Sequence, residues 1–196
     1  VATLEDPDEF IRSYNRDRTM VSISFIAAGQ EAGISNTSDS FTEEGLDFSA
    51  GKTVEGLPIS QSYLNSMGTW AYTMKCPVER DGRETGSLYI EYIYDSFEEV
   101  LPRGFYGGNA LLYIMDARSQ RFVLKPRGMG ERKAGHLNLE DFYRANNILE
   151  PDVKNAVAHS VDTGNNFMFY HHIQNKESLI FMWAVNDGGV YLIGYV

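Results

Sequence analysis

The sequence predicts an α+β fold made of two antiparallel sheets in series, each with helices on one face, and a short helix before the first sheet. Two observations predict it. The first half contains a pair of strongly patterned strands, 69–76 and 87–94, that are joined by a turn. The second half has a similar order of elements, with two strands, two helices and three further strands. The halves share this order without sharing enough letters to be a repeat.

The hairpin is the best-defined element of the chain. Its first strand alternates large apolar residues with smaller or polar ones: Trp70, Tyr72, Met74 and Cys76 against Ala71, Thr73 and Lys75. Alternation with period two places each set on one face of a strand. The second strand is rich in β-branched and aromatic residues, which suit a pleated sheet. Asp81-Gly82 predicts a tight turn between them, and Pro77 and Gly86 are expected to end the two strands.

The rest of the first half reads as one helix, two strands and a long polar segment. Asp6 and Pro7 predict the start of a helix over 6–17. Residues 20–28 alternate as a strand, and 34–37 form a weaker one. The remainder of 34–61 is rich in Ser, Thr, Gly and Asp, and we expect short helices over a sheet, or a lid. A brief helix at 95–101 should stop at Pro102.

A joint at 103–108 separates the two halves, which predicts domains at 1–102 and 103–196. Strands are expected at 110–116 and 121–126. A short helix follows at 139–144. Pro151 opens a better one over 152–161, and Gly164 ends it. The chain closes with strands at 166–173, 178–185 and 190–196.

Composition excludes several classes of protein. The chain has 196 residues, 43% of them hydrophobic and 22% charged, which is ordinary for a globular protein. A net charge of −10 argues against nucleic acid and acidic membrane surfaces as partners. The lone Cys76 forms no intramolecular disulfide and reads as a small apolar residue. The sequence contains no run of about 18 apolar residues, the length that would be needed to span a bilayer. Because the chain opens on Val1 and closes on a strand, we expect a piece of a longer protein.

The strand order, with two strands, inserted helices and three strands, is similar to the PAS-like fold. Two such modules after a helix resemble a double Cache sensor, the extracytoplasmic region of many bacterial receptors. Residues 68–78 and 86–92 resemble the membrane-distal module of sensors attached to diguanylate cyclases or histidine kinases, and 110–126 with 166–196 resemble the membrane-proximal module. The resemblance covers about residues 15–196.

This resemblance implies a ligand-sensing domain outside the cytoplasm, attached to the membrane only through flanking helices that are absent here. A small molecule would bind in the distal module and change a helix that leads to an absent cytoplasmic output domain. The amino-acid-binding subgroup carries an Arg and Trp series on a helix. Tyr14, Arg16 and Arg18 do not match that spacing, so amino-acid recognition is not carried over.

The predicted ligand site combines the hairpin with the loop before it. Trp70, Tyr72, Tyr92 and Tyr94 alternate on the two strands and could line an apolar pocket, with their hydroxyl and indole groups as donors. The alternative is that these rings fill the core. Ser62, Tyr63 and Asn65 in the preceding loop are expected to close over a small ligand.

No catalytic residue, metal ligand or cofactor is predicted. His171 and His172 are adjacent on a strand and point to opposite faces, so they do not share one ion easily. His159, Ser160 and Asp162 are neighbours on one helix and do not converge as a triad. Two other functions stay open. One is an interaction module in which two copies pair, and the other is a small enzyme that uses the carboxylates of the loop 39–55.

Overall fold

The computed structural model describes residues 6–14, 20–51, 53–99, 110–125, 138–185 and 189–196. The chain divides into two compact units, 1–98 and 99–196, and each is described by itself. The joint predicted at 103–108 lies outside the described residues. No helix among these residues is long and apolar enough to cross a membrane.

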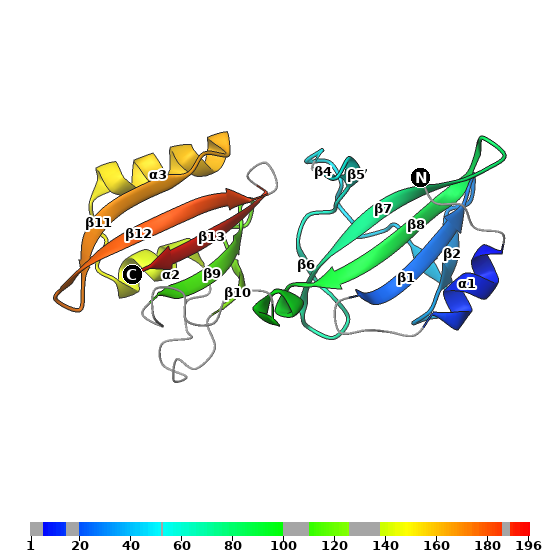
Figure 1. The fold of residues 1–196 in the computed structure, drawn as a ribbon, viewed down its shortest axis with the longest axis horizontal. Helices are drawn as coiled ribbons and strands as arrows, with labels where there is room; N and C mark the ends of the chain where they lie inside the picture. Colours follow the sequence, from blue (N-terminus) through cyan, green and yellow to red (C-terminus); the bar gives the residue numbers. More distant parts are fainter. Residues whose placement is uncertain (1–5, 15–19, 52, 100–109, 126–137, 186–188) are drawn as a thin grey trace. The chain divides into compact units, whose positions relative to one another are not determined.

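The first unit is built on a six-stranded antiparallel sheet with the order β3-β2-β1-β8-β7-β6 (Figure 1). The strands are β1 Met20–Ala27, β2 Ala32–Ser35, β3 Phe41–Thr42, β6 Tyr63–Leu64, β7 Trp70–Arg80 and β8 Arg83–Ile93. A separate small hairpin pairs β4 Thr53–Val54 with β5 Leu57–Pro58. The 3-10 helix η1, Tyr94–Glu99, follows β8 where a brief helix was predicted.

The predicted hairpin is β7–β8, and its turn is the Asp-Gly pair. Asp81 and Gly82 have φ values of 52° and 73°, as the tight turns that match strand twist require. The prediction that Pro77 and Gly86 end the strands is wrong, because Pro77 pairs with Ser87 inside the ladder. Beyond Met74, β8 is the only described strand that pairs with β7. A proline is tolerated there since its missing N–H can face away from the ladder.

The two faces of the first sheet are covered differently. On one face, Cys76 pairs with Leu88, and the helix α1, Pro7–Ser13, adds Ile11 to a core with Ile23, Phe25, Val78 and Leu88. We call this side the helix face. As predicted, Asp6 caps α1, accepting a hydrogen bond of 3.0 Å from the backbone N–H of Glu9. On the opposite side, Thr73 pairs with Glu91 and Lys75 with Tyr89, and these side chains contact Glu43, Tyr63 and Asn65 from the segment that precedes β7. We call this side the loop face.

The expectation of short helices in 34–61 is wrong for the residues described there. This stretch contains the end of β2, the two-residue strands β3, β4 and β5, and turns. The physical reason is its composition. Gly45, Gly51 and Gly56 take positive φ, and the apolar residues between them are too sparse to form a helical packing face.

The second unit has a five-stranded antiparallel sheet with the order β10-β9-β13-β12-β11. Its strands are β9 Leu111–Asp116, β10 Phe122–Leu124, β11 Phe167–Ile173, β12 Lys176–Val185 and β13 Val190–Tyr195. The helices α2, Leu139–Ala145, and α3, Pro151–Thr163, pack Phe142 and Val157 against Tyr113, Ile180 and Ile193. Gly164 ends α3, as predicted, and has the left-handed conformation.

Candidate functional site

The loop face of the first sheet carries the polar side chains of the central strands. Period-two alternation places Thr73 and Lys75 of β7 beside Glu91 and Tyr89 of β8, all facing the loop. Next to them, β1 contributes Ser22 opposite Glu91 and Ser24 opposite Tyr89. These residues make the loop face polar, whereas the helix face is apolar.

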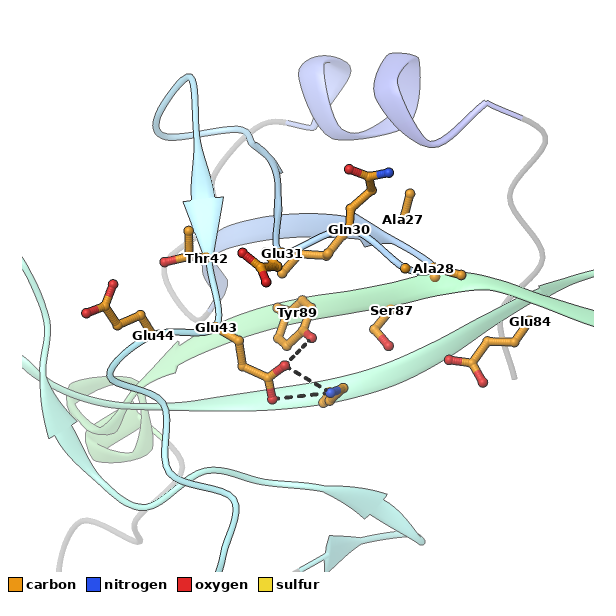
Figure 2. A pocket seen from close by; sticks show the side chains of 14 residues that line it. Ala27, Ala28, Gln30, Glu31, Thr42, Glu43, Glu44, Glu84, Ser87 and Tyr89 are labelled. Atoms are coloured by element: carbon orange, nitrogen blue, oxygen red, sulfur yellow. Dashed lines mark hydrogen bonds and ion pairs between the residues drawn. The ribbon is translucent and has the colours of Figure 1, made fainter.

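Lys75, Glu43 and Tyr89 form the first polar group on this face. The Lys75 ammonium lies 3.2 and 3.1 Å from the two carboxylate oxygens of Glu43, and the Tyr89 hydroxyl donates to the same carboxylate at 2.9 Å (Figure 2). Burial lowers the pKa of Lys75, but its interactions with Tyr89 and Glu43 outweigh this effect, so the pKa is raised. Burial and the hydrogen bond with Glu43 raise the pKa of Tyr89. Near neutral pH Lys75 is therefore an ammonium and Tyr89 a neutral phenol.

A pocket of about 520 Å³ opens beside this group. Its lining comes from the end of β1 and the following turn, from 42–44, and from β7 and β8. The charged residues in that lining are Glu31, Glu43, Glu44, Glu84 and Lys75. Ile26, Ala27, Ala28 and Gly86 add an apolar wall. Its volume lies within the range of about 300–1,000 Å³ that small-molecule sites occupy.

A second polar group lies around Thr73 of β7 and Glu91 of β8, each two residues from Lys75 and Tyr89 of the first group. The Tyr63 hydroxyl lies 2.6 Å from the Thr73 hydroxyl and donates to a Glu91 oxygen at 3.2 Å. The Asn65 side-chain amide donates to the other Glu91 oxygen at 2.9 Å. Burial raises the pKa of Tyr63 well above its usual value, and the Glu91 charge contributes to the rise. Among the described residues, no lysine or arginine forms an ion pair with Glu91.

The seven predicted site residues fall into two groups. Tyr63 and Asn65 meet on the loop face through Glu91. Trp70, Tyr72 and Tyr92 belong to the helix face, where the rings of Tyr72 and Tyr92 stack with centroids 5.5 Å apart.

Tyr94 packs against Tyr72 at 5.3 Å, and the Ser62 hydroxyl lies 2.8 Å from the Tyr94 hydroxyl. Burial, with a smaller contribution from Tyr92, raises the pKa of Tyr72 to about 12. A ligand at the aromatic group remains a prediction.

The sequence reasoning missed Glu43, Lys75, Tyr89 and Glu91. A signal for two of them was present. Lys75 lies among the smaller or polar residues of the first hairpin strand, and Glu91 interrupts an otherwise apolar strand. Charged residues at these alternate positions mark the face that carries polar chemistry. Glu43 had no such signal, because its contact with Lys75 spans 32 residues.

The residues considered for metal binding do not form a centre. His171 lies 3.1 Å from the Asn146 carbonyl oxygen through Nε2, and His172 is exposed. In the part of the chain that the structure describes, no three His, Cys, Asp or Glu residues gather as metal ligands.

Solved structures with a similar fold include the ligand-binding or sensory domains of three receptors. One is the ligand-binding domain of the Pseudomonas aeruginosa amino-acid chemoreceptor PctC, in complex with GABA. The match covers 97% of this chain and 81% of the PctC chain, with 13% identity and a TM-score of 0.59. The extracellular domain assigned to a histidine kinase, mmHK1S-Z2, covers 90% of this chain and 74% of its own, with 13% identity and a TM-score of 0.57.

The periplasmic sensory domain of the Campylobacter jejuni chemoreceptor Tlp1 covers 89% of this chain and 71% of its own, with 11% identity and a TM-score of 0.52. No family model and no curated protein matches the sequence. At these identities the comparison concerns the fold. The predicted α+β fold with PAS-like antiparallel sheets is confirmed.

Proposed function

We propose that this chain is the ligand-sensing domain of a bacterial transmembrane receptor and lies outside the cytoplasm. The observation that carries the proposal is the shared fold. It extends over 97% of the chain in a chemoreceptor ligand-binding domain and recurs in an extracellular domain assigned to a histidine kinase. The proposal includes no catalysis by the chain itself.

We place the ligand on the loop face of the first unit. A pocket of about 520 Å³ lies there, a volume typical of small-molecule sites, and its lining combines an apolar wall with polar and charged side chains. Its Lys75, Glu43 and Tyr89 are held by mutual hydrogen bonds before any ligand arrives. The aromatic group of Trp70, Tyr72, Tyr92 and Tyr94 is the second candidate, as the sequence predicted.

Ligand binding would bias the domain between two conformations and pass the change through flanking helices to an output domain. The bias is limited by the difference between the ligand's affinities for the two states. A histidine kinase or a diguanylate cyclase would serve as that output domain. Two copies of such a domain could pair, which would bring two output domains together.

One observation favours the alternative of an interaction module. Met168 and Tyr170 of β11 and Trp183 of β12 are 54%, 72% and 48% exposed, on the side of the second sheet that points away from its core. Large apolar side chains in such numbers are typical of a surface that contacts another chain.

Thermal unfolding against a panel of amino acids, carboxylates, amines, sugars and nucleobases tests the sensor proposal. A ligand at a hundred times its Kd should stabilise the protein by about 2.7 kcal/mol. On the loop face, the stabilisation should be lost in Glu43→Gln with Tyr89→Phe and kept in Tyr72→Phe. The reverse result would move the ligand to the aromatic group. A response to none of the compounds would count against the sensor and favour the interaction module.

A further inference from the structure

We infer that the loop-face pocket takes an alkyl amine with two or more ammonium groups. This inference rests on the proposed sensing function and names the chemical class of its ligand. It follows from three features of the pocket: its charge, its existing contact with an ammonium, and the apolar wall between its charged groups.

The charge of the lining is strongly negative. The lining includes four glutamates and one lysine, and none of its described residues is an arginine or a histidine. Lys75 already neutralises Glu43. Glu31, Glu44 and Glu84 make no ion pair or side-chain hydrogen bond with any described residue. Like charges around a concave surface focus the field and raise the local concentration of cations. An anionic ligand would instead meet three carboxylates and a lysine that is already engaged.

The floor of the pocket is already built to hold an ammonium. The Lys75 nitrogen contacts both Glu43 oxygens and lies over two aromatic rings, 5.4 Å from the Tyr89 centroid and 5.8 Å from the Phe48 centroid. A carboxylate beside aromatic faces is a typical environment for an ammonium group. Phe41 packs on Tyr89 at 5.0 Å and supports that ring. The Lys75 side chain therefore occupies a place that the ammonium of a ligand could share or take.

The remaining carboxylates come from different elements around the opening. Glu31 precedes β2, Glu44 follows β3, and Glu84 lies in β8. Figure 2 shows Glu44 pointing away from the Glu43–Tyr89 pair. Ala27 and Ala28 line the wall between Glu31 and the strand that carries Glu84. In this pocket, carboxylates are separated by an apolar wall. A ligand whose ammonium groups are separated by methylene groups would match this arrangement.

Isothermal titration calorimetry, which measures the affinity of the whole chain for putrescine and spermidine, tests this inference. Butane-1,4-diol and succinate are the neutral and anionic controls of similar length. Both amines should bind, spermidine more tightly, and their affinity should fall as salt is added. The two controls should not bind. Binding of succinate or the diol without the amines would overturn the inference and leave the sensor proposal standing. A failure of every compound in the wider panel would overturn both.

Two variants sharpen the test. Combining Glu31→Gln, Glu44→Gln and Glu84→Gln removes three exposed charges that make no ion pair or side-chain hydrogen bond with the described residues. The fold should therefore survive, and the Kd for spermidine should rise about tenfold. A matched variant removes the same charge from the second unit through Asp152→Asn, Asp162→Asn and Glu177→Gln, and its Kd should stay unchanged. An equal rise of the Kd in both variants would mean that spermidine responds only to the net charge of the protein, and would overturn the inference.

Lys75→Met keeps most of the length of the side chain and removes the resident ammonium. Amine affinity should rise several-fold, since the ligand no longer competes with Lys75 for Glu43. A loss of amine binding in this variant would show that Lys75 contacts the ligand favourably, as it would with a ligand carboxylate, and would overturn the inference. A circular dichroism spectrum matching that of the unaltered chain confirms that the fold is intact.

Discussion

Buried tyrosines give this protein a sensitivity to alkaline pH. Tyr72 stacks on Tyr92, and Tyr113 lies in the second core, 4.8 Å from the Phe122 ring. Burial raises the pKa of each phenol from 10.0 to about 12. The folded chain thus keeps these protons at a pH where the unfolded chain has lost them, and unfolding releases them.

The free energy of unfolding should therefore fall as pH rises from about 10 to about 12. Below that window both states hold the protons, and the contribution to stability is complete. Urea unfolding at several pH values, followed by circular dichroism, measures the slope. Tyr113→Phe should flatten it, whereas Tyr170→Phe, on a side chain that is 72% exposed, should not. A slope that is equal in both variants would contradict the assignment.

Single residues also show how far the sequence could predict the site. The alternation of Tyr72, Thr73 and Lys75 separates the two faces of β7 correctly. It does not say which face the loop will cover, because that depends on contacts such as Lys75 with Glu43 and Tyr89 with Glu43, across 32 and 46 residues. Large aromatic side chains drew the prediction to the helix face. Tyr63 and Asn65, which the sequence placed in the loop, do reach the polar face.

Among the elements, α1 has seven residues, too few to be stable as an isolated helix, and depends on the sheet it covers. Its Ile11 is 0% exposed and completes the core of the helix face, while the neighbouring Phe10 is 40% exposed. The helix should therefore be held mainly through one side chain.

Ile11→Ala should lower the free energy of unfolding of the first unit by about 2–4 kcal/mol, because it opens a cavity against Ile23 and Phe25. Phe10→Ala is the matched control and should cost clearly less. Hydrogen exchange, read on the amides of β1, separates the two variants. Equal protection in both would mean that α1 contributes little to the unit.

Predictions of elements succeeded where the signal was local. Caps and breakers such as Asp6, Pro151 and Gly164 act within one turn of chain, and the helices α1 and α3 begin or end at them as expected. The prediction at Pro77 was wrong because a proline ends a strand only where its missing N–H is needed for pairing. Whether another strand lies on that side depends on the order of strands in the sheet. The polar segment before the hairpin lacked any period, so its two-residue strands could not be predicted.

For the molecule as a whole, the two units keep separate cores. The larger cluster joins Tyr113, Met115 and Phe142 to β12 and β13, while the other cluster joins Ile11 to β1, β7 and β8. Each cluster takes its residues from one unit, and the predicted domain boundary at 102/103 stays a prediction.

Residues 99–196 expressed alone should accordingly fold, with a cooperative urea transition and hydrogen-exchange protection of β12 and β13. The shorter piece 139–196, which lacks β9 and β10, is the control and should remain unfolded because it loses Tyr113, Met115 and Phe122 from the core. A longer fragment without a cooperative transition would show that the second unit depends on the first.

The lengths of the outer strands bear on how the protein behaves in concentrated solution. The first sheet ends on β3 and β6, which have two residues each and offer little backbone for another chain to pair with. Among the described strands, the second sheet ends on β10 with three residues and on β11 with seven. Long open edges recruit further strands. Self-association at high protein concentration is thus expected to begin at β11. The solubility of the protein should therefore depend mainly on the edge of the second sheet.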